Sequence, residues 1–597
     1  MCGIFGMLGR QASLQTTRRA LAVQQHRGPD DTGWVEIAEG PLCLGHNRLA
    51  IIDVSALGHQ PMASADGRNW IVFNGEIYNY RELRRELGDY SFRSSSDTEV
   101  ILAAYARWGV ACLERFIGMF SFALWDGERQ ELLLARDRLG IKPLNYGYVD
   151  GTLVFASEIK AILTAGHAVT PDAETWSDYL AYGIYEQHDR TFFRGIRQLP
   201  AGCYMYCRPD GTSSINAFWD LKQIVETAGA APLESDELEA LMVDAVRYRL
   251  RSDVPLGVNI SGGLDSLLLA SMVDQLAAPG QKLHAATAGF SDSRYDERGY
   301  AREVISGTRW LPLETAEGPD MLRSTARVAL SHQEAPIGGI ATLAYHNLHE
   351  KIRAAGLTVQ LEGQGLDEMF AGYAYYRGLT DGSQSLQGWL SEGLYQDGTS
   401  PLARDVLSQS LRDAGQAWHW RVPALDDAVN QALFVDITQR KLPRVLRMND
   451  RLSMAHSIEL RVPFLDHRLV EAAFRIPGLA KIAGGMSKRP LRDIAQRRHP
   501  SMTSIWSEKR AVVAPQTGWL RGAGAGFVED CLESPWLLDS GLFDVDRLRD
   551  RFRVFVQNGA NNSFFVWQWV NVALWCELFV GGAWRDHAVR TQAHGMV

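Results

Sequence analysis

A change of pattern between Ile224 and Ser235 constrains this chain more than any other feature of its sequence. Before it, short apolar runs are broken by turns, and after it apolar runs alternate with longer helical stretches. The residues between are small and typical of a flexible linker. A chain of 597 residues also exceeds the roughly 250–300 residues at which a single core stops growing. We therefore predict two domains, residues 1–219 and 236–597, joined by a linker over residues 220–235.

The two halves predict different folds. In the first, apolar runs at residues 70–73 and 120–125 alternate with turns in the manner of β-strands. In the second, strand-like runs at residues 254–260 and 283–290 are followed by helical stretches, which is typical of parallel βαβ units. From Leu402 onward the pattern is mostly helical. We expect a β-rich N-terminal half, then an α/β domain with a parallel sheet and a mostly helical C-terminal part.

Composition excludes several classes of protein. The formal net charge is -9 and the basic residues are scattered, which argues against nucleic acid as a partner. Residues 554–576 carry too many polar side chains for a membrane span, so we predict a buried helix there and no membrane partner. The N-terminus lacks the basic flank and apolar run of a secretory signal, which favours a cytoplasmic location. Seven cysteines without CxxC spacing predict neither disulfides nor a structural metal.

The cysteine at position 2 is the first candidate catalytic residue. Once Met1 is removed, Cys2 becomes the N-terminal residue, and its own α-amine can act as the base for its thiol. An α-amine titrates near ~7.7–8.0, so it can take the thiol proton at neutral pH. Nucleophile and base would then belong to one residue.

Other polar residues of this half complete a candidate site. Asn74 and Gly75 follow an apolar strand and could stabilise a tetrahedral oxyanion. Arg48 could hold an α-carboxylate, and Asp97 could hold an α-ammonium. Together these groups fit glutamine. Taken singly, each has another interpretation: Asn74 and Gly75 as a hairpin turn, Arg48 as a surface ion-pair member, and Asp97 as a helix N-cap.

A glycine-rich turn in the second half is the other candidate site. Residues 261–266 read Ser-Gly-Gly-Leu-Asp-Ser between a strand and a helix, so backbone N–H groups could hold a pyrophosphate. No Gly-Lys-Ser/Thr follows, which excludes a Walker loop. Asp367 with Asp265 could hold Mg²⁺ bridging phosphates. The alternatives are a plain tight turn for the loop and a solvated helix start for Asp367.

The first half resembles the class II glutamine amidotransferases, which have an N-terminal nucleophile and an αββα-type sandwich. The motifs are Cys-Gly-Ile-Phe-Gly at residues 2–6, His-Arg-Gly-Pro-Asp at 26–30, Arg-Leu-Ala-Ile at 48–51, Asn-Gly-Glu-Ile-Tyr-Asn at 74–79 and Ser-Asp-Thr-Glu at 96–99. The resemblance implies a nucleophile, an oxyanion hole and a clamp for glutamine, formed respectively by Cys2, by Asn74 and Gly75, and by Arg48, Glu76 and Asp97.

Nearly the whole chain resembles the asparagine synthetases, through residues 135–144, 450–466 and 487–492. The resemblance implies ATP and Mg²⁺ as cofactors, an acyl-adenylate, release of AMP and pyrophosphate, and an internal tunnel for ammonia. It implies that Lys488 contacts the phosphates. The alternative is that Lys488 lies on a surface helix. The implied nucleotide-binding residues are Ile260, Ser261, Gly262, Gly263, Leu264, Asp265, Ser266, Ala288 and Gly363, with Asp265 and Asp367 on the metal.

Departures from the family pattern fall in the acceptor region. Gln364 stands where the family usually has glutamate, residues 333–343 are more apolar than expected, and residues 507–513 differ from the usual run. We predict an acceptor pocket lined by Ile337, Gly339, Ile340 and Leu366, which would favour an apolar carboxylic acid over aspartate.

Several functions therefore stay open. The partners we expect are glutamine and a carboxylic acid acceptor, either aspartate or another acid. One alternative is a tailoring enzyme that amidates a specialised metabolite, forming an amide or a related N-acyl product such as a hydroxamate. Others are a cyclising relative with a vestigial glutaminase and a regulatory binder of glutamine and ATP. A homodimer is compatible with the sequence, which does not fix the oligomeric state.

Overall fold

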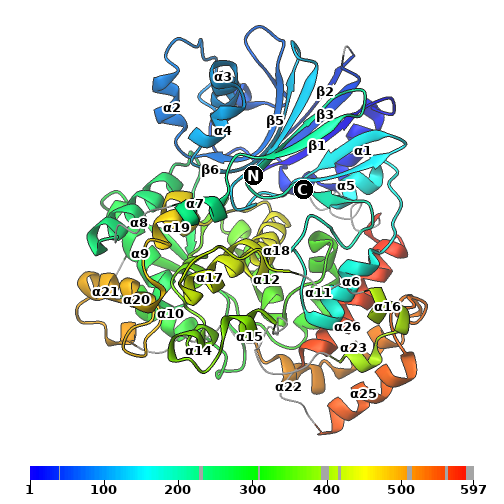
Figure 1. Ribbon diagram of the computed structural model, residues 1–597, viewed down its shortest axis with the longest axis vertical. Coiled ribbons are helices and arrows are strands. Elements are labelled where there is room, and N and C mark those ends of the chain that lie inside the picture. Colours follow the sequence, from blue (N-terminus) through cyan, green and yellow to red (C-terminus); the bar gives the residue numbers. More distant parts are fainter. Residues whose placement is uncertain are drawn as a thin grey trace.

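The computed structural model describes residues 1–38, 40–227, 233–306, 309–391, 403–414, 419–506, 514–558 and 563–585. Its N-terminal part contains two six-stranded antiparallel sheets (Figure 1). The first has the order β10(Arg197–Gln198), β8(Asn145–Val149), β9(Thr152–Ala156), β1(Gly3–Leu8), β3(Leu42–Arg48), β2(Asp31–Ile37). The second has the order β12(Ser213–Ala217), β11(Cys203–Cys207), β7(Glu131–Arg136), β6(Gly118–Asp126), β5(Trp70–Ile77), β4(Met62–Ala63).

The two sheets pack face to face. Apolar side chains from both meet in one buried cluster, which includes Ile4, Leu44, Val72 and Phe155. Helices α1(Leu14–Val23) and α5(Ile159–Thr164) contact each other, and α1 lies on β1 and β3 of the first sheet. On the second sheet, α3(Asp97–Trp108) packs on β5, and α2(Tyr80–Glu86) packs on α3. This is an αββα sandwich, so the predicted fold of the N-terminal half is confirmed.

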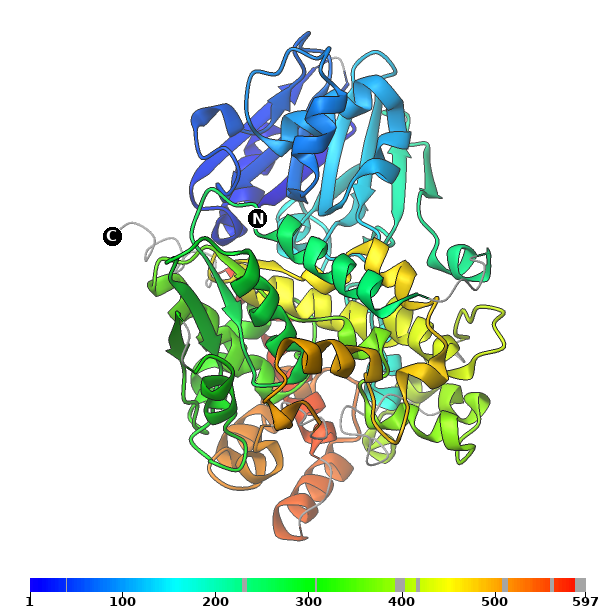
Figure 2. The same ribbon diagram turned by 90° about the vertical axis from the view of Figure 1, so that its left-hand side faces the viewer.

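The second half contains a five-stranded parallel sheet, as predicted. Its order is β15(Trp310–Glu314), β14(Leu283–Thr287), β13(Leu256–Asn259), β16(Val359–Leu361), β17(Glu459–Arg461). Strand β13 is central, and the chain continues to β14 on one side and later to β16 on the other. In open parallel sheets, ligands bind outside the carboxyl ends of the strands where the order reverses. The residues that follow β13, β14 and β16 therefore meet at one edge of the sheet. Figure 2 shows these strands in green, below the two antiparallel sheets.

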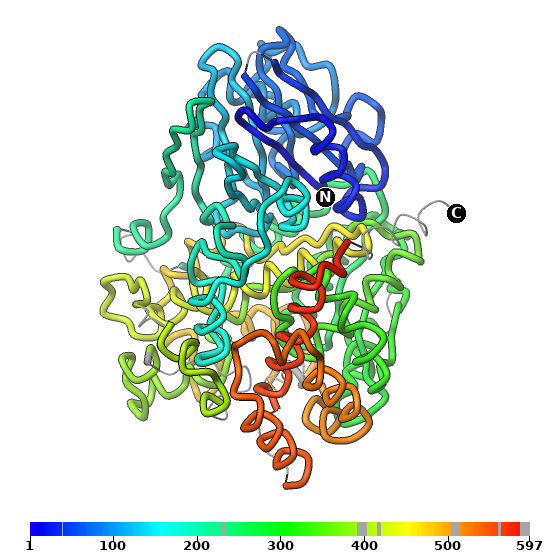
Figure 3. Tube along the Cα trace, turned by 90° about the vertical axis from the view of Figure 1, so that its right-hand side faces the viewer, coloured from blue at the N-terminus to red at the C-terminus, as the bar shows by residue number. Residues whose placement is uncertain are grey.

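Helices cover this sheet, and from residue 403 onward most elements of the described part are helices. Helix α26(Phe564–Trp575) is buried along its whole length and lies beside α6(Ala173–Tyr182), where the rings of Trp176 and Trp575 are 5.1 Å apart. Figure 3 shows the two segments together, cyan beside red. The single buried helix predicted over residues 554–576 is wrong, because α26 has its own non-helical N-cap at Ser563. Val554, on α25(Val545–Asn558), is moreover exposed.

Two further expectations concern connections and membranes. The predicted linker begins with a helix, α7(Leu221–Thr227), and α8(Ser235–Arg249) follows it. Residues 228–232 lie outside the described part. The first half of the linker is thus ordered, because Leu221 and Val225 turn one face of α7 into the core. Of the helices that the described ranges contain, none combines the length and apolarity that crossing a bilayer needs.

Buried ion pairs join the two halves. Arg27, just after α1, places its guanidinium 2.9 Å from the carboxylate of Asp450, which belongs to α18(Leu442–Met454). Lys142 lies 3.7 Å from the same carboxylate. Burial acts to raise the pKa of Asp450, but the two cations hold it below its ordinary value. All three side chains are at most 3% exposed, so each charge depends on the others for compensation.

Replacing Asp450 with alanine should therefore destabilise the fold strongly. Removal of one partner from a buried ion pair costs ~3–5 kcal/mol, because the remaining charges stay desolvated. The thermal unfolding midpoint of D450A should fall by several degrees. Asp89→Ala is the matched control, since Asp89 and Arg107 form an exposed pair, and such pairs contribute roughly 0–1 kcal/mol. Equal midpoints for D450A and D89A would contradict this account.

Candidate active sites

Cys2 lies buried at the start of β1, at the junction of the two halves. Its backbone nitrogen donates to Oδ1 of Asn74 at 2.9 Å, and its carbonyl accepts from Nε of Arg27 at 3.0 Å. Asn74 and Gly75 belong to β5, so the alternative of a hairpin turn is wrong. A side chain at Gly75, whose φ is +151°, would place its Cβ 2.1 Å from the carbonyl oxygen of Met119. Glycine is therefore required there.

Met1 is 1% exposed, and its amine lies 3.3 Å from Oε2 of Glu459 on β17. Arg461, on the same strand, joins the cluster by ion pairs to Glu459 at 2.5 Å and to Glu76 at 3.4 Å. While Met1 is attached, the nitrogen of Cys2 is a peptide amide and not a base. The thiol has no such base of its own in this form, and burial raises its pKa.

The carboxylates of Glu76 and Asp97 both lie near Glu459. Burial and the nearby Glu459 raise the pKa of Glu76 well above its ordinary value. Asp97 is the first residue of α3, and its Oδ2 accepts from the backbone N–H of Ile77 at 2.9 Å. Burial raises the pKa of Asp97 to about 6. The N-cap of α3 is Ser96, so the alternative role of Asp97 as the cap is wrong.

Arg48 ends β3 and is 6% exposed, so its alternative role as a surface ion-pair member is also wrong. Its guanidinium donates to the backbone carbonyls of Ser55, at 2.8 Å, and Asp53. Its charge is near enough to lower the pKa of the Cys2 thiol. The structure thus brings Cys2 together with all five other residues that sequence reasoning named for this half: Arg48, Asn74, Gly75, Glu76 and Asp97.

A cavity of about 560 Å³ opens at the carboxyl ends of β13, β14 and β16. Every nucleotide-binding residue predicted from the sequence lines it, and so do Asp367 and Lys488. Gly262 has φ +77°, and a Cβ there would lie 2.4 Å from Cβ of Tyr300, so the loop needs glycine. Helix α9(Leu264–Leu276) starts directly after the loop, with Gly263 as its N-cap. Helix N-termini of this kind hold phosphates.

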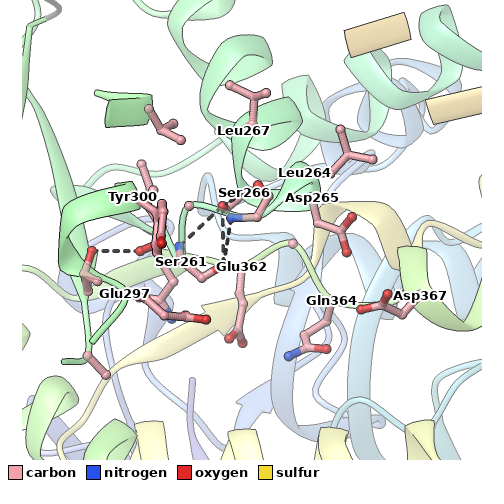
Figure 4. A pocket seen from close by; sticks show the side chains of 18 of the residues that line it. Ser261, Leu264, Asp265, Ser266, Leu267, Glu297, Tyr300, Glu362, Gln364 and Asp367 are labelled. Atoms are coloured by element: carbon pink, nitrogen blue, oxygen red, sulfur yellow. Dashed lines mark hydrogen bonds between the residues drawn. The ribbon is translucent and has the colours of Figure 1, made fainter. Parts of the chain in front are cut away.

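Lys488 connects the two acidic segments of the cavity. Its Nζ lies 2.7 Å from Asp265 and 2.6 Å from Asp367, and Figure 4 shows these two carboxylates turned toward one another. Burial acts to lower the pKa of Lys488, but the two carboxylates raise it above its ordinary value. At 5% exposure the residue is not on a surface helix, so that alternative is wrong.

The same carboxylates suit a metal ion. Both already hold one cation, the Lys488 ammonium. Mg²⁺ typically takes one or two protein carboxylates and completes its octahedron with substrate phosphates and water. The donor set therefore fits the predicted Mg²⁺, with Asp265 and Asp367 as its ligands.

The predicted acceptor pocket is wrong. Ile337, Ile340 and Leu366 are fully buried, and none of them lines the cavity. Ile337 instead packs against α26, where its N–H donates to Oδ1 of Asn571 at 2.8 Å. The apolar run at residues 333–343 thus serves the core. Residues 507–513, the other departure from the family pattern, lie outside the described part.

Sequence reasoning missed several residues on the cavity wall. Apart from Arg492, which belongs to the segment 487–492, they lie outside the quoted motifs, and they are Tyr300, Tyr345, Lys441, Val445, Arg492, Met502 and Ile505. It also missed Glu362, which follows β16 and lines the cavity. The one available signal was its place beside Gly363 in the acidic loop.

Comparisons with known proteins agree with this arrangement. Residues 1–219 match a family described as a glutamine amidotransferase domain, and residues 237–577 match asparagine synthase. A putative glutamine-hydrolysing asparagine synthetase of Mycobacterium bovis is 30% identical, covering 99% of this chain and 98% of the relative. Asparagine synthetase 1 of Bacillus subtilis is 27% identical, covering 89% of this chain and 90% of the relative. The amidase chyE of Penicillium rubens is 29% identical, covering 87% of this chain and 90% of the relative. The chain belongs to the asparagine synthase family and is an asparagine-synthetase-like, glutamine-dependent amidotransferase.

Proposed function

We propose that this protein hydrolyses glutamine at Cys2 and uses the released ammonia to amidate a carboxylic acid that ATP has activated in the cavity. The observation that carries the proposal is the position of Lys488 between Asp265 and Asp367 in that cavity. A buried cation held by two carboxylates beside a glycine-rich loop matches what phosphate activation of an acid needs.

The glutaminase reaction begins once Met1 has been removed. The free amine of Cys2 then takes the thiol proton, and the thiolate attacks the side-chain carbonyl of glutamine. Asn74 and Gly75 stabilise the oxyanion, ammonia leaves, and water hydrolyses the γ-glutamyl thioester to glutamate. Glu76 and Asp97 hold the α-ammonium of the substrate, and Arg48 holds its α-carboxylate.

The synthetase reaction uses the cavity. A carboxylate of the acceptor attacks the α-phosphorus of ATP, and the bond to pyrophosphate breaks, which leaves an acyl-adenylate. The loop over residues 261–266 binds the pyrophosphate, and Lys488 offsets the charge that builds up on the phosphates. Mg²⁺, when held by Asp265 and Asp367, neutralises phosphate oxygens. Ammonia then attacks the acyl carbon, and AMP leaves.

Two acceptor classes follow from the cavity wall. Aspartate is one, because Lys441 and Arg492 line the cavity and could hold a second carboxylate. An apolar carboxylic acid is the other, favoured by Tyr345, Val445, Met502 and Ile505 on the same wall. The second would make the protein a tailoring enzyme.

The test is AMP and pyrophosphate release with glutamine, ATP and Mg²⁺, with aspartate, benzoate or hexanoate as the acid. Release that depends on aspartate would assign an asparagine synthetase, and release that depends on an apolar acid would assign a tailoring enzyme. Glutamine hydrolysis without acid-dependent AMP for any acid would contradict the proposed synthetase reaction.

Lys488→Met should separate the two reactions. Loss of the cation removes charge stabilisation in the cavity, and removal of one such group typically lowers kcat ~10²–10³-fold. Acid-dependent AMP release should fall by this amount, while glutamine hydrolysis at Cys2 should be unchanged. Lys351→Met is a suitable control, because Lys351 is an exposed residue of α12(Ile340–Ala354). AMP release by K488M at the wild-type rate would exclude this role.

Glutamine binding should weaken in mild acid. The α-ammonium binds a carboxylate only when the carboxylate is ionised, and the pKa of Asp97 is about 6. Ionisation of Asp97 is therefore nearly complete at pH 8 and is lost as the pH falls through 6. The KM for glutamine should rise about tenfold for each pH unit below that value. In D97N the KM should be high at every pH, whereas D89N should follow the wild type. A wild-type KM that is equal at pH 5 and pH 8 would refute this assignment.

A further inference from the structure

Glu362 places a carboxylate in the cavity away from Lys488. It follows the end of β16, is 9% exposed and lines the cavity. Figure 4 shows its side chain and that of Gln364 pointing the same way, away from Ser266. Asp265 and Asp367, by contrast, both bind Lys488. Glu362 is thus a carboxylate of the cavity that the mechanism above leaves without a task.

The groups that bind Glu362 are neutral amides. Nδ2 of Asn449 donates to its Oε2 at 2.9 Å, and the nearby side-chain amides of Gln364 and Asn259 act to lower its pKa. Such donors orient a carboxylate without neutralising its charge. The carboxylate of Glu362 is therefore held in a fixed position, where it can interact with a cation that binds in the cavity.

Glu362 also has a pKa suited to proton transfer. Burial raises its pKa to about 7, and the nearby amides of Gln364 and Asn259 act against this rise. Burial likewise raises the pKa of Tyr345, which therefore stays protonated at neutral pH. Other titratable groups also line the cavity. Glu297 lies just before α10(Arg298–Val304), and Tyr300 and Glu303 lie on it. The remaining ones are Tyr373, Lys441 just before α18, Arg492, Asp265, Asp367 and Lys488.

A short series of contacts through α18 links Glu362 to the Cys2 site. Asn449, which binds Glu362, is next to Asp450 in α18. Asp450 binds Arg27, and Arg27 donates to the carbonyl of Cys2. A single helix thus separates Glu362 from the groups that hold the nucleophile.

We propose that Glu362 is the general base that takes a proton from the nitrogen as ammonia attacks the acyl-adenylate. The lone pair of nitrogen forms the C–N bond, one N–H proton moves to the carboxylate of Glu362, and the C–O bond to AMP breaks. AMP leaves with the electron pair of that bond, and Glu362 then releases its proton to water. Gln364, where the family usually has glutamate, is an amide and accepts no proton in this way. The proposal rests on the synthetase reaction proposed above.

The experiment compares E362Q with wild type and with E350Q, a matched control at an exposed position of α12. Ammonium chloride replaces glutamine, and the acid is the one that supports AMP release in wild type. Exchange of labelled pyrophosphate into ATP measures adenylation, which needs no amine. E362Q should keep this exchange and its glutamine hydrolysis, which shows that it folds. Amide formation should fall ~10²–10⁴-fold, the usual contribution of a general base.

The pH profile gives a second readout. The fraction of ammonium present as NH3 also rises with pH, so total ammonium is adjusted at each pH to keep free NH3 constant. Under these conditions amide formation by wild type and E350Q should rise with pH through about 7, as Glu362 ionises. E362Q should lose this limb. Asn449→Leu should move the limb to higher pH, because a hydrogen bond that favours the ionised carboxylate is lost.

Three results would overturn the proposal. Amide formation by E362Q at the wild-type rate, with the wild-type limb, would show that Glu362 takes no proton. Equal losses in exchange and amide formation, with a raised KM for the acid, would show that Glu362 binds the acceptor instead. Absence of acid-dependent exchange in wild type itself would refute the synthetase reaction, and the role of Glu362 with it.

Discussion

The need to compensate buried charge determines how the two halves of this protein meet. Arg27 and Lys142 come from the antiparallel sandwich, Asp450 comes from a helix over the parallel sheet, and all three are almost fully buried. An unpaired charge in such a place would be strongly destabilising. The halves therefore pack in the one arrangement that brings these groups together. Arg27 also binds the carbonyl of Cys2, so the same contact positions the proposed nucleophile.

The position of the cavity follows from the parallel sheet. Strands β13, β14 and β16 end at one edge, and the loops after them carry the glycines and carboxylates that a nucleotide needs. Lys488 arrives from a distant part of the sequence and is held by Asp265 and Asp367. The rigid sheet fixes the two loops, and the buried lysine fixes their separation. The proposed base, Glu362, lies at the same edge and is linked to the Cys2 site through contacts of α18.

Local patterns made much of this predictable. The glycine of a strained loop, as at Gly262, and an N-terminal cysteine are visible in the sequence, and the strand and helix periods follow from burial on one face. Contacts between distant residues were not predictable. Arg27 and Asp450 are 423 positions apart, and neither segment contains a sequence pattern that indicates which residue the other will contact. Ile337 was wrongly placed in the acceptor pocket, because the sequence pattern of an apolar residue is the same whether its side chain lines a ligand pocket or packs in the core. Glu362 was missed because its pKa depends on burial.

We propose that the two sites serve one reaction through their shared buried contact. The most direct test supplies glutamine labelled with nitrogen-15 in its side-chain amide, together with an excess of unlabelled ammonium chloride and the accepted acid. Mass spectrometry of the amide product then reports the source of its nitrogen. We expect the product to keep most of the label, because ammonia should pass from Cys2 to the acyl-adenylate without mixing with the unlabelled ammonium in solution. A product in which the label is diluted to the level of free ammonium would contradict it.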